Sequence, residues 1–451
     1  MPPPTLNEHV LAEILSYCDI YHVVKMTQVD KRCRSAALAK QLWISLIRDL
    51  EFRGLRDVDP LEQLEDCTTE DLIVKVKRVA SGPRTWLPSS PTPPKLEREV
   101  LVTLGPQTYE TGTILEVLPG GKHFLLRRLP HGSIYEIWAV SSQSRIWSRQ
   151  PKPSELSEIE VMEGGEKAVV MFGGSTNLPL LEFIEVDLRT GDSFVSFETP
   201  IPGQIDVATA ARFQLVGEHL VFSLVTKTLS EVHVVNWANA TYVLLQFPRM
   251  ESIACSLMPG YVSVLHFNAD PDRRLFSSVY ALDSLDWKPI ASWAQMLPDT
   301  PSPISSVMLP IAEVNLITSL QLVGRVSPFQ RGAYRFAVHV VTEKPAASGI
   351  ISRLWQTLFA TRDEQRIHYS LVFVPPSLEM VPLHFNSALP RPMYGVAAGR
   401  GMIIVLDGSN EMRPVIHYDQ VLSNTPLPQL GTHSAALPLV KDNVLRIMYF
   451  E

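Results

Sequence analysis

The chain has 451 residues, of which 45% are hydrophobic and 19% are charged, and its 40 Lys and Arg against 47 Asp and Glu give a net charge of -7. This length exceeds one ordinary core and suits a small domain plus a large one, or a repeat array. The negative charge and a pI near 6.0 argue against nucleic acid as the main partner, because phosphate binding needs a clustered positive surface.

Cysteine usage and hydropathy point to a reducing compartment. The four cysteines are widely spaced and contain no CxxC pair, so the sequence suggests neither a disulfide framework nor a zinc site. No basic-then-apolar signal opens the chain, and no apolar run approaches the ~20 residues that span a bilayer. We therefore expect a cytoplasmic or nuclear protein with no metal, no cofactor and no membrane association.

Residues 1–54 have the pattern of a small helical module. Val10 and Ile14, and beside them Leu11 and Leu15, recur at a spacing of four, which places apolar residues along a short helix. Pro2–Pro4 cannot continue that helix backwards, and Asn7 or Thr5 is a suitable N-cap. A longer helix follows, with Leu42, Leu46 and Leu50 on one face and Trp43 and Ile47 beside them. About fifty residues with so small a core need a second packing surface.

The order of residues in this segment resembles the F-box. The resemblance rests on Leu6, Glu8, Val10-Leu11, Ile14-Leu15, Val29 before the basic Lys31-Arg32, and the terminal Leu42-Trp43. It covers about the first tenth of the chain. Asn7 departs from the family pattern, which usually has Pro there, and Cys33 stands where an aromatic residue is common. These two departures bear on how tightly the module binds an adaptor.

The resemblance implies a substrate-receptor subunit of a cullin-type SCF ubiquitin ligase, not itself an enzyme. Its partners would be the SCF adaptor, through that adaptor a cullin, and an unidentified target protein. The matching apolar positions would divide between the core of the module and the adaptor interface. They are Leu6, Val10, Leu11, Ile14, Leu15, Val29, Leu42 and Trp43.

A helical extension over residues 55–81 and a proline-rich linker over 82–96 follow the module. Thr68-Thr69-Glu70-Asp71 caps a helix that runs through Val79, with acidic residues in its first turn and basic residues in its last, as the helix dipole prefers. Five prolines between Pro83 and Pro94 then forbid regular helix. After them the hydrophobic periodicity changes from helical to alternating.

A repeated sequence pattern runs through residues 97–451. A glycine turn precedes a short apolar strand at Gly120-Gly121, Gly164-Gly165, Gly217 and Gly260, so the turns recur 44, 52 and 43 residues apart. Hairpins follow each turn, at 137–147, 183–195, 232–245 and 279–287. This repeat predicts a β-propeller, with seven blades favoured and six possible, although no Trp-Asp blade ending recurs. A two-layer sandwich followed by a second β domain explains the alternation but not the fixed period.

Two further features concern the last third of the chain. Residues 444–450 form a strand whose natural partner is the strand at 100–104, and their pairing would close the ring and remove a free edge. Near 348–361, Ile351, Leu354, Trp355 and Leu358 have helical spacing between two strand-like runs. We interpret this insertion as a helix on the propeller rim, with a partner-binding helix as the alternative.

Catalytic motifs are absent from the sequence. There is no HExxH, no GxxxxGK[ST] and no GxSxG, and Gly399-Arg400-Gly401 precedes a strand rather than the helix of a dinucleotide site. The histidines in or beside strands suit hydrogen-bonded structural roles: His123, His219, His233, His266 and His384. Two alternatives stay open, namely a propeller-fold hydrolase or lyase with a helical cap, and an F-box scaffold outside any ligase.

Overall fold

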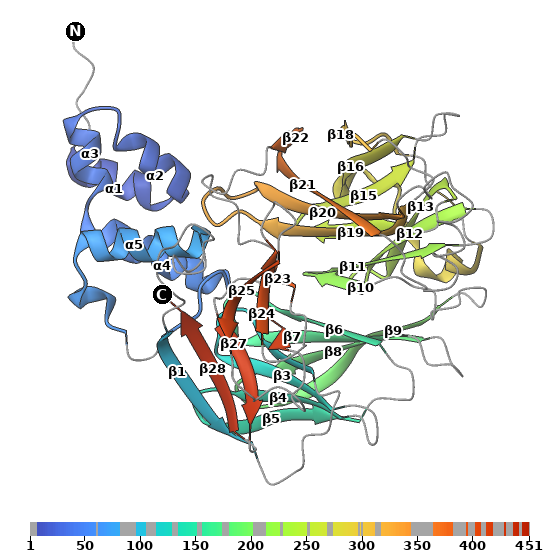
Figure 1. The fold of residues 1–451 in the computed structure, drawn as a ribbon, viewed down its shortest axis with the longest axis horizontal. Helices are drawn as coiled ribbons and strands as arrows, with labels where there is room; N and C mark the ends of the chain where they lie inside the picture. Colours follow the sequence, from blue (N-terminus) through green and yellow to red (C-terminus); the bar gives the residue numbers. More distant parts are fainter. Residues whose placement is uncertain are drawn as a thin grey trace, which may run out of the picture.

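The computed structural model of this chain contains an N-terminal group of helices beside a large all-β region (Figure 1). The described residues are 7–59, 62–81, 96–104, 114–128, 134–150, 156–173, 180–201, 213–225, 229–249, 253–267, 274–295, 298, 301–311, 317–343, 364–381, 394–395, 402–406, 412–417, 428–429, 436–441 and 444–450.

Five α-helices and one 3-10 helix make up the helical module. Their bounds are α1 Glu8–Ser16, α2 Ile20–Met26, α3 Lys31–Ala37, α4 Lys40–Phe52, η1 Leu64–Asp66 and α5 Thr69–Ser81. Asn7 is the N-cap of α1, where its side chain accepts a hydrogen bond from the backbone N–H of His9, and Asp19 and Asp30 cap α2 and α3 in the same way. Thr68 and Asp71 bond each other reciprocally at the start of α5.

One hydrophobic cluster holds the helices together. Helix α4 is the largest single contributor, and its residues in the cluster include Leu42, Trp43, Ile47 and Leu50, all 4% exposed or less. The predicted apolar face of α4 is therefore confirmed. Arg56 pairs with Glu51 and Glu62, and Lys75 reaches Glu62 at 2.6 Å, so this ion-pair network ties α4 to α5.

The strands described in the β region form seven sheets, in which nearly all neighbouring strands are antiparallel. Sheet I contains β2 (Ile114–Val117), β3 (His123–Arg128), β4 (Ile134–Ala139) and β5 (Ser144–Arg149), with β26 (Pro428–Gln429) parallel to β2. Sheet II contains β6 (Leu156–Val161), β7 (Lys167–Gly173), β8 (Leu180–Asp187) and β9 (Ser193–Pro200). Sheet III contains β10 (Phe213–Val216), β11 (His219–Val225), β12 (Leu229–Asn236), β13 (Thr241–Pro248) and β17 (Lys288–Pro289).

The remaining sheets continue the series. Sheet IV contains β14 (Ala254–Met258), β15 (Tyr261–Phe267), β16 (Leu275–Ala281) and β18 (Ser305–Met308), and sheet V contains β19 (Ile317–Val326), β20 (Tyr334–Glu343), β21 (Glu364–Val374) and β22 (Ser377–Val381). Sheet VI contains β23 (Tyr394–Gly395), β24 (Met402–Leu406) and β25 (Met412–His417). Sheet VII contains β27 (Ala436–Lys441), β28 (Val444–Phe450) and β1 (Leu96–Thr103).

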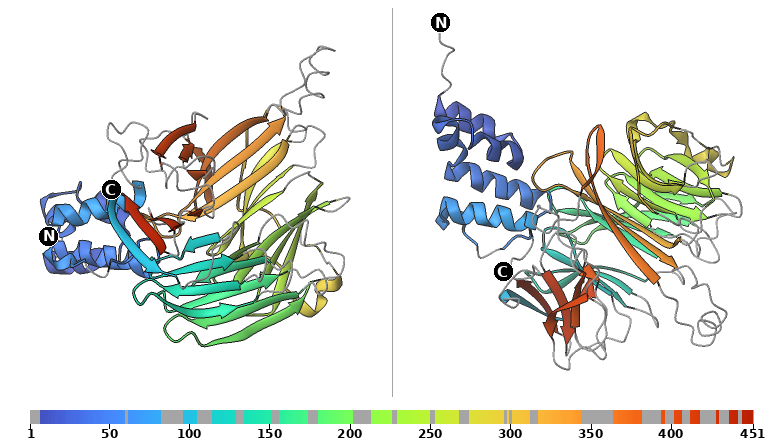
Figure 2. Two further views of the ribbon diagram at one scale, coloured as in Figure 1. Left: turned by 60° about the horizontal axis from the view of Figure 1, so that its bottom comes forward. Right: turned by 45° about the horizontal axis from the view of Figure 1, so that its top comes forward.

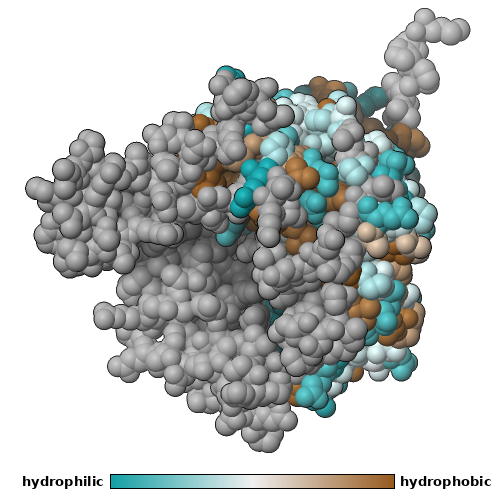
Figure 3. Space-filling model, turned by 90° about the vertical axis from the view of Figure 1, so that its right-hand side faces the viewer, coloured by the Kyte–Doolittle hydropathy of each residue, from teal (hydrophilic) through white to brown (hydrophobic). Residues whose placement is uncertain are grey.

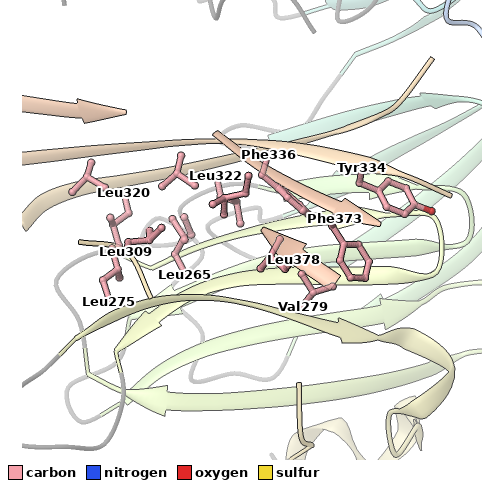
Figure 4. Packing of buried hydrophobic residues seen from close by; sticks show 14 of the residues in the cluster. Leu265, Leu275, Val279, Leu309, Leu320, Leu322, Tyr334, Phe336, Phe373 and Leu378 are labelled. Atoms are coloured by element: carbon pink, nitrogen blue, oxygen red, sulfur yellow. The ribbon is translucent and has the colours of Figure 1, made fainter. Parts of the chain in front are cut away.

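Each hydrophobic cluster in the β region joins two successive sheets. Separate clusters lie between sheets VII and I, I and II, II and III, III and IV, and IV and V. Figure 4 shows the last of these, in which Leu265, Leu275 and Val279 of sheet IV face residues of sheet V. Successive antiparallel sheets that pack face to face in chain order form a propeller-like arrangement, and a pair of sheets in a sandwich would share a single interlayer core.

The predicted pairing across the two ends of the β region is confirmed. β28 lies between β1 and β27, and Val100 is opposite Ile447 in the antiparallel register (Figure 1). Leu445 and Ile447 are both fully buried. The seven-blade count stays a prediction, because much of residues 382–435 and the whole insertion at 348–361 lie outside the described residues.

The glycine turns occur where the sequence predicts them. Gly120-Gly121, Gly164-Gly165, Gly217 and Gly260 each lie between the first and second strands of sheets I to IV, and all have positive φ. The fourth predicted hairpin is wrong. After β16 the chain leaves sheet IV through η4 (Leu282–Ser284), places β17 beside β13 of sheet III, forms η5 (Ile290–Gln295) and only then returns as β18. Leu282, Leu285 and Trp293 are buried and anchor this excursion.

The helical module contacts the sheets directly. The turn between β19 and β20, residues 327–333, reaches the helices in both views of Figure 2, and Phe329 packs against the helical cluster. The Phe329 carbonyl accepts from the N–H of Tyr21 at 2.9 Å, Arg53 donates to the Ser327 carbonyl, and Arg331 pairs with Asp49.

A second set of contacts joins the module to sheets I and II. The N–H of Gly164 donates to the Phe52 carbonyl at 3.2 Å, and the N–H of Val58 donates to the Gly120 carbonyl at 3.0 Å. Gly121 has a φ of +68°, and a side chain there would lie 2.6 Å from Asp57. The sequence predicts a linker between the two regions but none of these contacts.

Candidate docking surface on the helical module

The sequence-predicted adaptor residues divide into two groups in the structure. Leu15, Leu42 and Trp43 belong to the core of the module at 2–4% exposure, and Leu11 is half-buried beside them. Val10 and Ile14 are 46% and 47% exposed, and Val29 is 64% exposed. Leu6 lies outside the described residues. Only Val10, Ile14 and Val29 therefore offer a largely exposed side chain to another molecule.

Helix α1 separates its apolar residues onto two faces. Leu11 and Leu15 pack inward, whereas Val10, Ile14 and then Tyr17 follow the i, i+4, i+7 spacing of one outward face. Tyr17 is 80% exposed. The single apolar stripe expected from the sequence is thus two adjacent stripes, because a helix with apolar pairs at i, i+1 and i+4, i+5 has a face too wide for one small core to cover.

Further exposed apolar residues lie on, between and directly after the neighbouring helices α2 and α3. Seven of the sixteen large hydrophobic side chains that are exposed in the described part of the chain lie within residues 10–38. We call this group the docking surface. Its members are Val10, Ile14, Tyr17, Tyr21, Val24, Val29 and Leu38. Tyr17, Tyr21, Val24 and Leu38 were missed by the sequence analysis, although the spacing of Tyr17 from Val10 and Ile14 could have indicated it.

Such a concentration of exposed apolar residues is unusual for a free surface. Single exposed hydrophobic residues are common on proteins, but grouped ones mark contacts with another molecule. On the face of the β region seen in Figure 3, hydrophobic and hydrophilic residues of the described part are interspersed. Helices α4 and α5 cover the other side of the module core. The module contacts the sheets through Phe52, Tyr21 and Asp49. These contacts leave most of α1 and the 27–30 turn accessible to another molecule.

The two departures from the F-box pattern have local roles in the structure. Asn7 accepts a hydrogen bond from the backbone N–H of His9 at 3.2 Å, so it begins α1 as an N-cap. Cys33 is half-buried in α3, and desolvation together with a hydrogen bond to Asp30 raises the pKa of its thiol, which keeps the thiol protonated. The backbone N–H of Cys33 in turn lowers the pKa of Asp30, the cap of α3.

Four histidines of the β region are at least partly buried among the strands, and their burial lowers their pKa values. Burial lowers the pKa of His123 to about 4 and also lowers the pKa of His219, His233 and His266. His233 is fully buried, accepts from the indole of Trp293 at 3.3 Å and lies 3.4 Å from Glu231. His384 and Gly399–Gly401 lie outside the described residues. Within the described part of the chain no group of His, Cys, Asp and Glu is arranged to hold a metal.

Comparisons with known proteins leave the family open. No family model matches the chain, and no curated protein matches it. In the part of the chain that is described, none of the helices combines the length and the apolar character needed to cross a bilayer.

Solved structures similar to this chain include β-propellers. They include the β-propeller domain of Cps50 (Swd1) from Myceliophteria thermophila, with TM-score 0.38, 9% identity, and coverage of 77% of this chain and 99% of that chain. The β-propeller domain of the Trilobed protease from Pyrococcus furiosus has TM-score 0.36, 9% identity and coverage of 76% and 92%. The WD40 domain of SCAP from fission yeast has TM-score 0.36, 9% identity and coverage of 74% and 84%. With every TM-score below 0.5, the assignment of the fold rests on the sheets and clusters described above.

Proposed function

We propose that this chain is a substrate-receptor subunit of an SCF-type ubiquitin ligase. The docking surface on α1, α2 and the start and end of α3 binds the adaptor and, through it, a cullin. The propeller-like sheets bind a target protein, and the chain itself catalyses nothing. The observation that carries the proposal is the division of the F-box-like residues, because Leu15 and Trp43 complete the core while Val10 and Ile14 stay exposed.

The contacts between the module and the sheets support the same role. A receptor subunit has to hold its target at a defined position relative to the rest of the ligase. Contacts from the 327–333 turn and from the Gly120 and Gly164 turns hold the module on three different sheets. The proline-rich linker is then not the only connection between the two regions.

The test is direct binding of purified SCF adaptor to the full chain carrying Ile14→Glu. Ile14 is 47% exposed, so a buried carboxylate at the interface should weaken adaptor binding at least about tenfold without unfolding the module. Val74→Glu on α5 is the matched control, since Val74 is 45% exposed and lies outside the docking surface. Unchanged binding by the Ile14→Glu chain, or equal loss in both variants, would contradict the assignment.

A scaffold role outside any ligase makes a different prediction. It predicts that the adaptor binds the docking surface but that the complex brings in no cullin. Reconstitution with adaptor and cullin, followed by size-exclusion chromatography, separates the two. A ternary complex supports the receptor role, and an adaptor complex that excludes the cullin supports the scaffold.

A further inference from the structure

A pocket of about 570 Å³ opens at the boundary between sheets III and IV. The turns at the ends of β10–β11, β12–β13 and β14–β15 supply part of its wall, and the excursion between β16 and β18 supplies the rest. Its lining residues include His219, Asn239, Thr241, Gly260, Asp283 and Trp287. The excursion that the structure has in place of the predicted fourth hairpin therefore forms part of this pocket.

Aromatic groups form one side of the pocket and are held in place. The indole N–H of Trp287 donates to the Leu282 carbonyl at 2.7 Å, so its donor is already used inside the protein. The ring of His219 lies 5.4 Å from that of Trp287, centroid to centroid. Burial lowers the pKa of His219, and the Asn236 side chain lies 3.2 Å from its Nε2, so the imidazole is neutral at pH 7.

The charge of the pocket is negative. Asp283 is its one ionised lining residue, and neither Lys nor Arg is among the lining residues. Asp283 is exposed, and among the described residues it takes part in no ion pair, whereas Asp286 three residues later pairs with Lys288. Asn239 and Thr241 add side-chain oxygens. An aromatic face beside an uncompensated carboxylate and neutral acceptors suits a guanidinium group, which stacks on indole and bonds carboxylate.

From this geometry we infer that the pocket between sheets III and IV binds an arginine side chain of a target peptide. Because the pocket would hold part of the target, this inference rests on the proposed function. The pocket is linked to the turn that holds the helical module: Tyr334, directly after the 327–333 turn, donates to the Pro259 carbonyl at 2.7 Å, and Gly260 beside it lines the pocket. Tyr261 of the pocket packs edge-on against the Tyr334 ring.

The test uses the full chain and two capped tripeptides, acetyl-Gly-Arg-Gly-amide and its citrulline counterpart, in calorimetric titrations. Citrulline keeps the size and most hydrogen bonds of arginine but has no charge. We expect the arginine peptide to bind at least about fivefold more tightly than the citrulline peptide. Added salt should lower the affinity of the arginine peptide, because it screens the charge interaction. Equal affinities, or no heat from either peptide, would overturn the inference.

Variants locate the binding within the pocket. Asp283→Asn should reduce the affinity for the arginine peptide about fivefold to tenfold and leave the citrulline peptide unchanged. Asp286→Asn is the matched control, the same change outside the lining, and should leave both affinities as they are. Equal losses in the two variants would mean that general surface charge attracts the peptide, which would refute the pocket.

Adaptor binding separates this inference from the proposed function. The Asp283→Asn chain should bind purified adaptor normally, and the Ile14→Glu chain should bind the arginine peptide normally. If the adaptor never binds but the arginine peptide does, the receptor role fails and the pocket stands as a peptide site. If the adaptor binds but the peptide does not, the pocket assignment alone is wrong.

Discussion

The helical module and the β region use their apolar residues in opposite ways. In the described part of the β region every cluster is shared by two successive sheets, so sheets I to IV are covered on both faces by their neighbours. The module has one cluster and leaves seven large apolar side chains exposed over residues 10–38. Repetition lets successive sheets bury one another's faces, whereas the three short helices α1–α3 leave apolar side chains exposed, and our proposal that the module binds a partner starts from this difference.

The two regions also differ in how far apart in the sequence their contacting residues lie. Most strands of sheets I to V pair with the strand next in sequence through a short turn or loop. The module contacts sheets I, II and V through pairs that are distant in the sequence, such as Val58 with Gly120, Phe52 with Gly164, and Asp49 with Arg331. The β region is thus built mostly from local pairings, and the position of the module depends on a few distant ones.

The largest expected effect comes from breaking the pairing of the two ends of the β region. Deleting residues 444–451 removes β28 from between β1 and β27 and takes away the buried Leu445 and Ile447. We expect aggregation or loss of the cooperative unfolding transition, because two strand edges and an apolar face become exposed. Differential scanning calorimetry measures this. A milder variant, Ile447→Ala, should cost about 2–5 kcal/mol of unfolding free energy, and a soluble deleted chain with an unchanged transition would contradict this account of the seam.

An intermediate effect is expected from separating the two regions at Phe329. Phe329→Ala removes the side chain that the 327–333 turn packs on the helical cluster, at a cost of about 2–4 kcal/mol to the module. Hydrogen exchange should then rise in residues 8–52 and stay unchanged in β6–β9. Phe194→Ala is the control, because Phe194 is 60% exposed on β9. Unaltered exchange in the helices would mean that the module is stable without this contact.

The smallest expected effect is a dependence of β-region stability on pH. His123 has a folded-state pKa of about 4 against 6.5 for the free side chain, because burial disfavours its charged form. Its contribution is therefore present above pH 6.5 and is lost as the pH falls toward 4, by at most about 1.4 kcal/mol per pH unit. The melting temperature of the His123→Gln chain should fall less between pH 7 and pH 5 than that of the unchanged chain. If the melting temperatures of the two chains fell equally between pH 7 and pH 5, the lowered pKa of His123 would be refuted as a cause of the pH dependence.

Glycine turns and helix signals are the features that could be predicted from the sequence alone. A glycine with positive φ between two apolar runs encodes a tight turn by local backbone geometry, and four such turns are confirmed. The Thr68–Asp71 cap and the buried face of α4 likewise follow from spacing of three and four residues. The F-box-like residues were recognised by their order, and the order did not say which of them are buried.

Tertiary structure alone decided the features that carry the two proposals. Residues 279–287 are predicted as a hairpin, yet β17 pairs with β13 of the preceding sheet, and the excursion forms part of the pocket wall at Trp287. Phe329 has no distinguishing pattern in the sequence, yet it packs against the hydrophobic cluster of the module. Sequence periodicity reports which residues share a face over a few turns or strands. Which surface that face packs against depends on contacts between segments that are distant in the sequence, and a local pattern does not encode those contacts.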